Sequence, residues 1–442
     1  MITTIAVFLL VLGFLIFIHE LGHYAAARHA GVRVEQFSIG FPPKLWGKKV
    51  GETEYLISWI PVGGYVRLWG QNLNDENEAD PENYASKSIF QRFYILVAGP
   101  SMNLLFAFLF MPLVYMIGVN VPKYLNSYPV VFQVSEQGLA QRIGLQPGDE
   151  IVSANGKELQ SWQQLYDMVG EISPESTLTL VVSRNGYLVS LKETSLAEME
   201  RDGTGWTPHI EPVVGSFSEN SQAESAGLQL GDRIIRINGK AIEDWSQITE
   251  TIQTEQNSTD KANTNHNSQP SPLNVEVDRN GTIMKIEVIP LYDAANQRFL
   301  MGMGIEMTRQ SYGPIDSVIM GSERLWFVTR ATFSFMGKLF SGQGTMNDVG
   351  GPVRIGQVLG DAARNSITDL FFLVAVISLQ LGIFNLFPIP VLDGGHIFFL
   401  LLEKIKGGPL NPVFRERIQM VGMSLLMLLM IVITYHDILQ LK

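Results

Sequence analysis

Residues 5–29 read IAVFLLVLGFLIFIHELGHYAAARH, and this stretch decides how the chain must fold. Ile5 to Ile18 is a continuous run of apolar residues and one glycine, long enough with its flanks to form a helix across a membrane. Three polar side chains follow at His19, Glu20 and His23. Polar groups are costly inside a membrane helix, so their presence indicates a function.

The H-E-x-x-H spacing indicates a metal site. Positions i and i+4 share one face of a helix, so His19 and His23 can each present a ring nitrogen to one ion. Glu20 lies beside them, placed to accept a proton from a water molecule at the metal. The alternative is a chance match, at roughly one in a hundred for a chain with so few histidines. The position inside an apolar helix makes chance a weaker explanation.

The composition indicates a membrane protein with a soluble part. The chain has 442 residues, of which 46% are hydrophobic and 17% charged, and its mean hydropathy is only +0.13. A net charge of −11 argues against a nucleic-acid partner. There is no cysteine, which excludes disulfides and leaves histidine and carboxylate side chains as the ligands for any zinc ion.

Four segments have the length and hydropathy of membrane-spanning helices, at about 3–26, 94–118, 368–387 and 419–435. The uncharged N-terminus lacks the basic region of a signal peptide, so the first helix is expected to be retained. Basic residues gather in the loops between the first and second spans and between the third and fourth, which places those loops in the cytoplasm. Both termini and the long acidic middle segment are then outside, which in a bacterium is the periplasm.

Two further apolar stretches are not expected to span the membrane. Val318 to Phe340 contains charged residues and is predicted to be an amphipathic helix on the outer membrane surface or against the helix bundle. Tyr55 to Leu68 holds two β-rich runs around a Pro/Gly turn, which predicts a cytoplasmic hairpin. This hairpin either dips into the membrane, where protein or a water-filled cavity satisfies its backbone, or packs as an ordinary hairpin.

The segment outside the membrane contains an internal repeat. Residues 143–157, IGLQPGDEIVSANGK, match residues 226–240, AGLQLGDRIIRINGK, and Trp162 and Trp245 keep the same offset. Later in the repeat the offset grows, and the extra residues fit within a polar tract at about 256–271. This tract is predicted to be a flexible loop.

Each repeat is predicted to contain strands, short helices, and Gly-Asp and Asn-Gly turns. The shared pattern x-G-L-x-x-G-D-x-I-x-x-x-N-G resembles the PDZ domain in its bacterial protease-associated form. The resemblance implies two tandem PDZ-like domains, at about 122–205 and 206–292. PDZ domains bind extended peptides at a sheet edge, and the alternative is that this pair serves as a spacer or a steric filter.

Two histidines leave a catalytic zinc ion one protein ligand short. The third predicted span ends in NLFPIPVLDGGH at residues 385–396, which places Asp393 at membrane depth after a helix broken by proline. An ionisable group in such a place is a functional candidate. His396 is the competing candidate: it is the third ligand itself, a group that supports the ligands, or a histidine that only packs.

The order of these features resembles the site-2 protease family over nearly the whole chain: H-E-x-x-H in the first span, N-x-x-P-x-P-x-L-D-G-G-H after the third, and tandem PDZ-like repeats between them. This resemblance implies an intramembrane zinc metalloendopeptidase. It implies Asp393 as the third zinc ligand beside His19 and His23. It also implies Glu20 as the general base, and Asn385 in substrate contact or transition-state support.

The same resemblance implies how substrates are bound and what they are. The hairpin at about 55–69 would pair with an extended substrate strand, with Gly63, Gly64 and Tyr65 as contact residues. Substrates would be single-span membrane proteins already trimmed outside by another protease, with an anti-sigma factor as the main example and remnant signal peptides as a second class. The PDZ pair would exclude bulky substrates. The resemblance therefore implies regulated intramembrane proteolysis in the sigma-E envelope stress response, at the bacterial inner membrane.

The expected architecture is an α-helical polytopic membrane protein with four transmembrane helices, a cytoplasmic β-hairpin and two periplasmic PDZ-like domains of mixed β and α structure. A first transmembrane pair occupies 1–121 and a second occupies 367–442. The two repeats at 122–205 and 206–292 lie between them, followed by a periplasmic linker with the amphipathic helix at 293–366.

Two other functional classes fit the sequence less well. A membrane scaffold, whose PDZ domains bind peptide C-termini, would not need Glu20. A zinc transporter would need polar residues along its spans, yet the second and fourth spans are almost purely apolar apart from Asn103.

Overall fold

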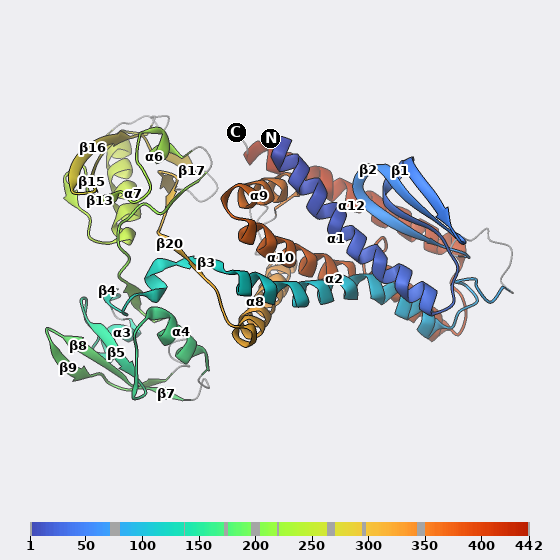
Figure 1. Ribbon diagram of the computed structural model, residues 1–442, viewed down its shortest axis with the longest axis horizontal. Helices are drawn as coiled ribbons and strands as arrows, with labels where there is room; N and C mark the ends of the chain where they lie inside the picture. Colours follow the sequence, from blue (N-terminus) through green and yellow to red (C-terminus); the bar gives the residue numbers. More distant parts are fainter. Residues whose placement is uncertain are drawn as a thin grey trace. The chain divides into compact units, whose positions relative to one another are not determined.

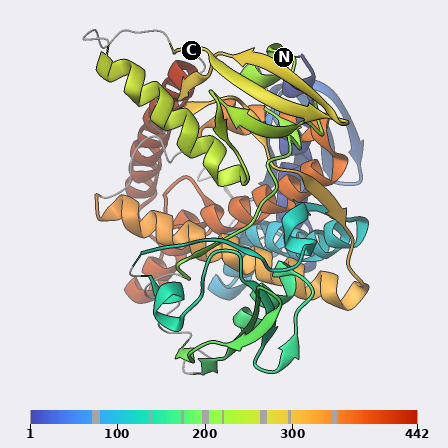
Figure 2. The same cartoon turned by 90° about the vertical axis from the view of Figure 1, so that its left-hand side faces the viewer.

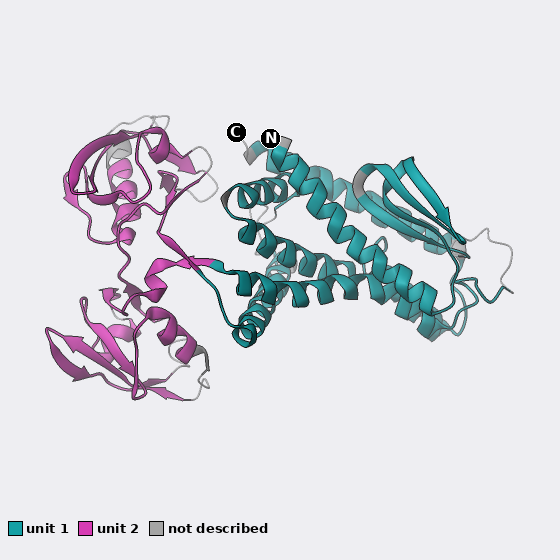
Figure 3. Ribbon diagram, viewed as in Figure 1, with its two compact units in different colours: residues 1–119, 310–442 teal, residues 120–309 magenta. Residues whose placement is uncertain are grey.

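The computed structural model describes residues 2–70, 80–136, 138–171, 176–195, 204–218, 221–262, 270–293, 298–342 and 350–440. The chain divides into two compact units, one of residues 1–119 and 310–442 and one of residues 120–309 (Figure 3). It leaves the first unit through β3 (Val119–Pro122) and returns through β20 (Met307–Gln310).

Among the described residues, four helices of the first unit are long and apolar enough to cross a membrane. They are α1 (Ile2–His29), α2 (Ile89–Ile117), α10 (Ile367–Asn385) and α12 (Pro412–Gln440). The start of α1, the end of α2, the start of α10 and the end of α12 lie toward one end of the bundle (Figure 1). Four successive membrane crossings require this alternation, and the prediction of four spans is confirmed.

Helix α2 is central to the bundle, because α1, α10 and α8 (Pro314–Phe340) all pack against it. Leu325 of α8 is fully buried in a cluster with residues of α2 and α10. Gly321 of α8 lies against Pro112 of α2, where a Cβ would come within 3.0 Å of the proline nitrogen. Of the two placements expected for this amphipathic helix, the structure has the one against the bundle.

Two of the described helices of the first unit were not predicted. Helix α9 (Pro352–Asn365) lies within the segment expected to be a linker, and α11 (Asp393–Lys406) follows the third span. The start of α9 is capped from α12, because Asp437 accepts hydrogen bonds from the backbone amides of Gly351 and Arg354 at 3.1 and 3.0 Å. A cap supplied by a distant helix leaves no local signal in the sequence.

Between α1 and α2 the chain forms a small sheet from β1 (Val34–Val50) and β2 (Thr53–Leu68). The predicted hairpin within residues 55–68 is wrong in its pairing. Its two β-rich runs belong to one irregular strand, and neither run has the other as its partner.

The centre of this sheet is residues 36–39, which are paired on both sides. Residues 64–67 pair with one side of this segment and residues 54–57 with the other, while residues 46–50 pair with the outer side of 53–57. Gly63 has a φ of 141°, a value that favours glycine, and it redirects the chain between the two runs without bringing them together. Residues 64–67 therefore form one edge of the sheet.

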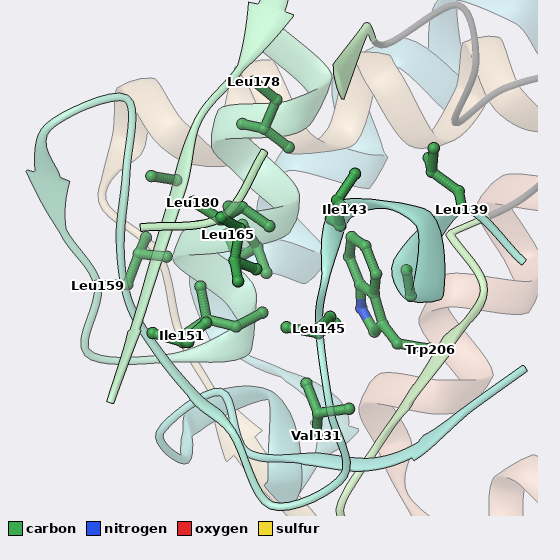
Figure 4. Close-up of a cluster of buried hydrophobic side chains, with 14 of the residues drawn as sticks. Val131, Leu139, Ile143, Leu145, Ile151, Leu159, Leu165, Leu178, Leu180 and Trp206 are labelled. Carbon is green, nitrogen blue, oxygen red and sulfur yellow. The ribbon is translucent and has the colours of Figure 1, made fainter. Parts of the chain in front are cut away.

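The first repeat of the second unit contains a four-stranded sheet in the order β6-β5-β8-β9. Strand β11 pairs with β4, and Trp206 lies in the same core beside Ile143 and Leu145 (Figure 4), so this repeat extends past the expected boundary at residue 205. Its elements are η1 (Lys123–Asn126), β4 (Val131–Val134), α3 (Leu139–Ile143), β5 (Glu150–Ala154), β6 (Lys157–Glu158), α4 (Trp162–Glu171), β7 (Thr177–Leu178), β8 (Leu180–Arg184), β9 (Tyr187–Ser190), β10 (Thr194–Ser195) and β11 (Trp206–Pro208).

The second repeat has a sheet in the corresponding order β14-β13-β15-β16, with helix α7 beside it (Figure 2). Strand β12 pairs with β19, beyond the expected boundary at residue 292. Its elements are β12 (Ser216–Phe217), α6 (Gln222–Ser225), β13 (Arg233–Ile237), β14 (Lys240–Ala241), α7 (Trp245–Ala262), β15 (Leu273–Arg279), β16 (Thr282–Val288), β17 (Leu291–Asp293), β18 (Arg298–Leu300) and β19 (Met303–Gly304).

The polar tract at 256–271 is not a loop throughout. Helix α7 continues to Ala262 and has 18 residues, against 10 in its counterpart α4. Gln256 is buried, and its side-chain amide exchanges two hydrogen bonds of 2.8 Å with the backbone of Ser271. These bonds hold the two ends of the tract together, and residues 263–269 lie outside the described residues.

Each repeat contains the same buried ion pair. Arg184 donates to Asp149 at 2.7 Å in the first repeat, and Arg279 donates to Asp232 at 2.7 Å in the second. Both aspartate side chains are only 1% exposed. In each repeat the arginine also donates to a backbone oxygen near the start of the motif, so it ties the final strands to the Gly-Asp turn.

Candidate metal centre

Helix α1 carries the two predicted metal-binding histidines one turn apart. The ring centroids of His19 and His23 are 4.8 Å apart, and their Nε2 atoms are 3.1 Å apart. Nδ1 of His23 lies 2.8 Å from the backbone oxygen of Ile95 in α2. A ring that donates from Nδ1 to this oxygen leaves the lone pair of Nε2 free for a metal.

Helix α2 reaches the histidines because two positions lack a side chain. A Cβ at Gly22 would collide with the backbone oxygen of Ala98, so glycine allows α1 and α2 to touch here. A Cβ at Gly99 would collide with Nε2 of His23 and lie 2.8 Å from Nε2 of His19. Gly99 therefore leaves open the space in which the two nitrogens converge.

The turn after α10 brings a carboxylate to the same point. Asp393 is the first residue of α11, and its Oδ2 and Oδ1 lie 3.0 and 3.4 Å from Nε2 of His19 and His23 respectively. One ligand atom from each of these three residues lies within 4.8 Å of the others. Side chains at Gly394 and Gly395 would collide with backbone oxygens of residues 386–389, so the turn that carries Asp393 requires both glycines.

His396, the competing ligand, lines the same cavity as this cluster, but its ring nitrogens lie against α12. Its Nδ1 accepts a hydrogen bond from Arg415 at 3.0 Å, and its Nε2 lies 3.5 Å from the side-chain nitrogen of Gln419. Burial and the positive charge of Arg415 lower the pKa of His396 to about 4. The ring is therefore neutral near pH 7, and the geometry groups Asp393 with the two histidines instead.

The three side chains line a cavity of about 380 Å³. Glu20 and Asn385 line the same cavity, as do Gly63, Gly64 and Tyr65 near the edge of the small sheet. A Cβ at Gly64 would lie 3.2 Å from Cγ of Glu20, so this edge and the carboxylate side chain are adjacent. The structure thus brings every residue predicted for the site to one cavity.

Sequence reasoning missed the contribution of α2 to this site. Ile95 contributes a backbone oxygen, and Gly99 contributes open space because it has no side chain. No side-chain motif in the sequence reveals either contribution. Asn103 is fully buried on the cavity, with Nδ2 3.4 Å from Nδ1 of His19. It was visible in the sequence as a polar exception in an apolar span.

The donor set fits zinc. Two imidazoles and one carboxylate, with one side open to a cavity, are the ligands of many catalytic zinc sites. The collision of a Cβ at Gly99 with Nε2 of His23 shows that the point of convergence has been kept clear of side chains.

Comparison with known proteins agrees with this geometry. The model of peptidase family M50 matches residues 7–429. The chain belongs to peptidase family M50. This M50 peptidase is 33% identical to the regulator of sigma-E protease RseP of Escherichia coli (strain K12), with 98% of each chain covered. The protease RseP of Yersinia pestis is 32% identical to it, also with 98% of each chain covered.

Family membership confirms the resemblance that the motifs indicated. The M50 peptidase is a zinc metalloprotease. With four apolar helices of membrane length among its described residues, it is a multi-pass membrane protein.

Proposed function

We propose that this M50 peptidase hydrolyses peptide bonds within the membrane-spanning segments of other proteins. The observation that carries the proposal is the convergence of His19, His23 and Asp393 on a cavity among helices of membrane length. A site at that depth would bring a hydrolytic group to a transmembrane segment, which a protease in water cannot reach.

His19, His23 and Asp393 are assigned as the zinc ligands. Zinc bound there supplies a Lewis acid that lowers the pKa of water and polarises a carbonyl group. The chain holds its three ligands on α1 and α11, while the close approach of α2 at Gly22 and Gly99 fixes their spacing. The cavity leaves one side of the cluster open for water and substrate.

Glu20 is assigned as the general base. It follows His19 in α1 and lines the cavity, so its carboxylate can accept the proton of the attacking water and pass it to the leaving amine. Asn385, at the end of α10, lines the same cavity. Its carboxamide can donate a hydrogen bond to the substrate or to the oxygen that gains negative charge.

Residues 64–67 are assigned as the edge that holds the substrate. Their pairings among the described residues all go to residues 36–39, and Gly63, Gly64 and Tyr65 line the cavity. A helical substrate hides its peptide bonds, so the scissile segment must become extended before hydrolysis. An extended segment can add to this edge as a further strand, and it would then pass beside Glu20.

The proposed topology places the small sheet in the cytoplasm, and both chain termini and the second unit in the periplasm, at the bacterial inner membrane. The distribution of basic residues supports it. The two repeats are proposed to be PDZ-like domains, the first continuing through β11 and the second through β19, and their corresponding strand orders and ion pairs support a common fold. They would bind peptide or exclude substrates with bulky outer domains.

The proposed substrates are single-span membrane proteins that another protease has already trimmed outside. The name of the Escherichia coli relative, a regulator of sigma-E, supports an anti-sigma factor as one of them. Remnant signal peptides are a second proposed class. The chain would then act by regulated intramembrane proteolysis in envelope stress signalling.

The test is cleavage of a single-span model substrate by the purified full chain in detergent. The wild type should cut within the span, and a chelator should stop cleavage until zinc is restored. Glu20→Gln should keep zinc and lose cleavage, whereas Glu52→Gln, an exposed glutamate in the turn between β1 and β2, should cut normally. Cleavage by Glu20→Gln at the wild-type rate would contradict the proposal, and substrate binding without cleavage by any form would favour a membrane scaffold.

A further inference from the structure

Asn103 is a buried polar residue in the middle of the helix bundle. It lies on α2, one turn after Gly99, and its side chain is fully buried. Among the described residues its Oδ1 has no hydrogen-bond partner. A buried carboxamide oxygen without a partner is costly, so a specific role for this side chain is expected.

The neighbour of this carboxamide is His19, whose Nδ1 lies 3.4 Å from Nδ2 of Asn103. Nε2 of His19 points the other way, to Asp393 at 3.0 Å. A neutral imidazole that offers its Nε2 lone pair to a metal carries its proton on Nδ1. That proton needs an acceptor, and a carboxamide nitrogen cannot be one.

Rotation of the carboxamide by 180° resolves the conflict at His19, and it moves the unpartnered position from Oδ1 to Nδ2. The two ends of a carboxamide have nearly the same shape, so Oδ1 then takes the place of Nδ2 beside the imidazole. The unpartnered oxygen gains a donor and the Nδ1–H of His19 gains an acceptor. His23 already has the equivalent arrangement, with Nδ1 facing the backbone oxygen of Ile95 at 2.8 Å.

We infer that Asn103 is a positioning residue for the metal centre. Its carboxamide oxygen accepts the Nδ1–H of His19 and so holds the ring in the tautomer and orientation that present Nε2 to zinc. This inference rests on the proposed role of His19 as a zinc ligand. Span two thus supplies an acceptor for each histidine, a backbone oxygen for His23 and a side chain for His19.

A purely structural role is the competing explanation, because Asn103 also joins α2 to α10. Its backbone oxygen accepts a hydrogen bond of 2.9 Å from the fully buried hydroxyl of Ser378. That bond does not involve the carboxamide. Ser378→Ala is therefore a matched control, since it removes a buried polar contact between the same helices and leaves the partner of His19 in place.

The experiment measures the affinity of the purified full chain in detergent for zinc alone, by competition with a chromogenic chelator. Asn103→Leu has a similar volume and no acceptor, and it should lose about 10- to 100-fold in zinc affinity. Asn103→Asp keeps an acceptor oxygen and should stay close to the wild type, as should Ser378→Ala. Asn103→Ala replaces the leucine variant if the latter does not fold. The absorption spectrum of the cobalt-substituted protein should change in the leucine variant and be restored in the aspartate variant.

The outcomes separate this inference from the function on which it rests. The inference is overturned if Asn103→Leu binds zinc as tightly as the wild type. It is also overturned if Asn103→Asp or Ser378→Ala loses as much zinc affinity as Asn103→Leu. His19→Ala is measured beside them. If it retains the zinc affinity of the wild type, the proposed ligand set has failed, and the inference about Asn103 falls with it.

Discussion

Gly22 of α1 lies directly against the backbone oxygen of Ala98 in α2. The contact falls inside the H-E-x-x-H motif, so this glycine sets the distance between the two helices at the level of the metal centre. The motif therefore has a packing function beside its chemical one. Even a methyl group at this position would push α2 away from the histidines.

Gly22→Ala is accordingly expected to destabilise the folded chain by about 1–3 kcal/mol, the usual cost of overpacking, and to lower zinc affinity. Gly13→Ala is the matched control in the same helix, because a Cβ there meets nothing within 4 Å. Thermal unfolding and bound zinc are measured for both variants. A Gly22→Ala protein with the zinc affinity of the wild type would show that α2 does not set the ligand spacing.

The choice between Asp393 and His396 is open to a direct test. Loss of a residue that only hydrogen-bonds to a metal ligand costs roughly 10- to 100-fold in metal affinity. Asp393→Asn should cost more than this, because it removes the charge of the proposed ligand itself. His396→Gln should keep zinc, since its ring nitrogens face Arg415 and Gln419. Zinc content after dialysis distinguishes the two. Full zinc content and activity in Asp393→Asn would make His396 the preferred ligand.

Gly64 tests the substrate edge separately from the metal. A Cβ at this position would lie 2.9 Å from the backbone oxygen of Ser38 and 3.2 Å from Cγ of Glu20, so Gly64→Ala must shift the edge away from Glu20. We expect roughly a tenfold or greater loss of cleavage, with zinc affinity unchanged, because small displacements of a reacting group are costly. Gly408→Ala serves as the control, since its Cβ meets open space. Undiminished cleavage by Gly64→Ala would argue against an added substrate strand.

The ion pair of the second repeat predicts how that repeat responds to mutation. Arg279→Gln leaves the buried carboxylate of Asp232 without its charged partner, which is strongly destabilising. Hydrogen exchange of strand β13 in the full chain should become at least about tenfold faster. Arg236→Gln, which breaks a pair whose arginine side chain is 51% exposed, should have little effect. Equal effects of the two variants would contradict the importance of burial.

The same pair predicts a pH dependence. Burial raises the pKa of Asp232, but the hydrogen bonds from Arg279 and from the backbone amide of Gln229, together with the charge of Arg279, outweigh burial and hold the pKa below its usual value. A carboxylate whose pKa is lower in the folded state than in the unfolded state stabilises the fold at pH values above its unfolded-state pKa. This stabilisation is lost as the pH falls through the folded-state pKa. Protection of β13, corrected for intrinsic exchange rates, should therefore fall below about pH 4. Protection that is constant down to about pH 2 would contradict this assignment.

The sequence predicted those features that depend on local pattern. Membrane spans are continuous apolar runs, so four were expected and four are present among the described residues. Hydropathy alone starts the second span at about residue 94, whereas its helix begins at Ile89, where Ser88 and Gln91 form a capping box. The S-x-x-Q pattern of that box is a local signal for a helix start, and it is independent of hydropathy.

What the sequence could not show are relationships made by the fold. The pairing of residues 36–39 with two different segments depends on how the whole sheet assembles, and two β-rich runs with a turn between them look like a hairpin when taken alone. The cap that Asp437 places on α9 joins parts of the chain far apart in sequence. The proposed histidine and aspartate ligands were predictable because their chemistry is unusual in a membrane, whereas Gly99 acts through the absence of a side chain.

The double pairing of residues 36–39 has a consequence for where a substrate is cut. Because this segment is held from both sides, the neighbouring edge at 64–67 cannot slide along the sheet relative to Glu20. An extended chain that shifts by one residue on a fixed edge exchanges the side chains on its two faces, whereas a shift of two residues restores them. When one substrate is cut at more than one bond, we expect the cuts to lie two residues apart, and the masses of its fragments would reveal that spacing.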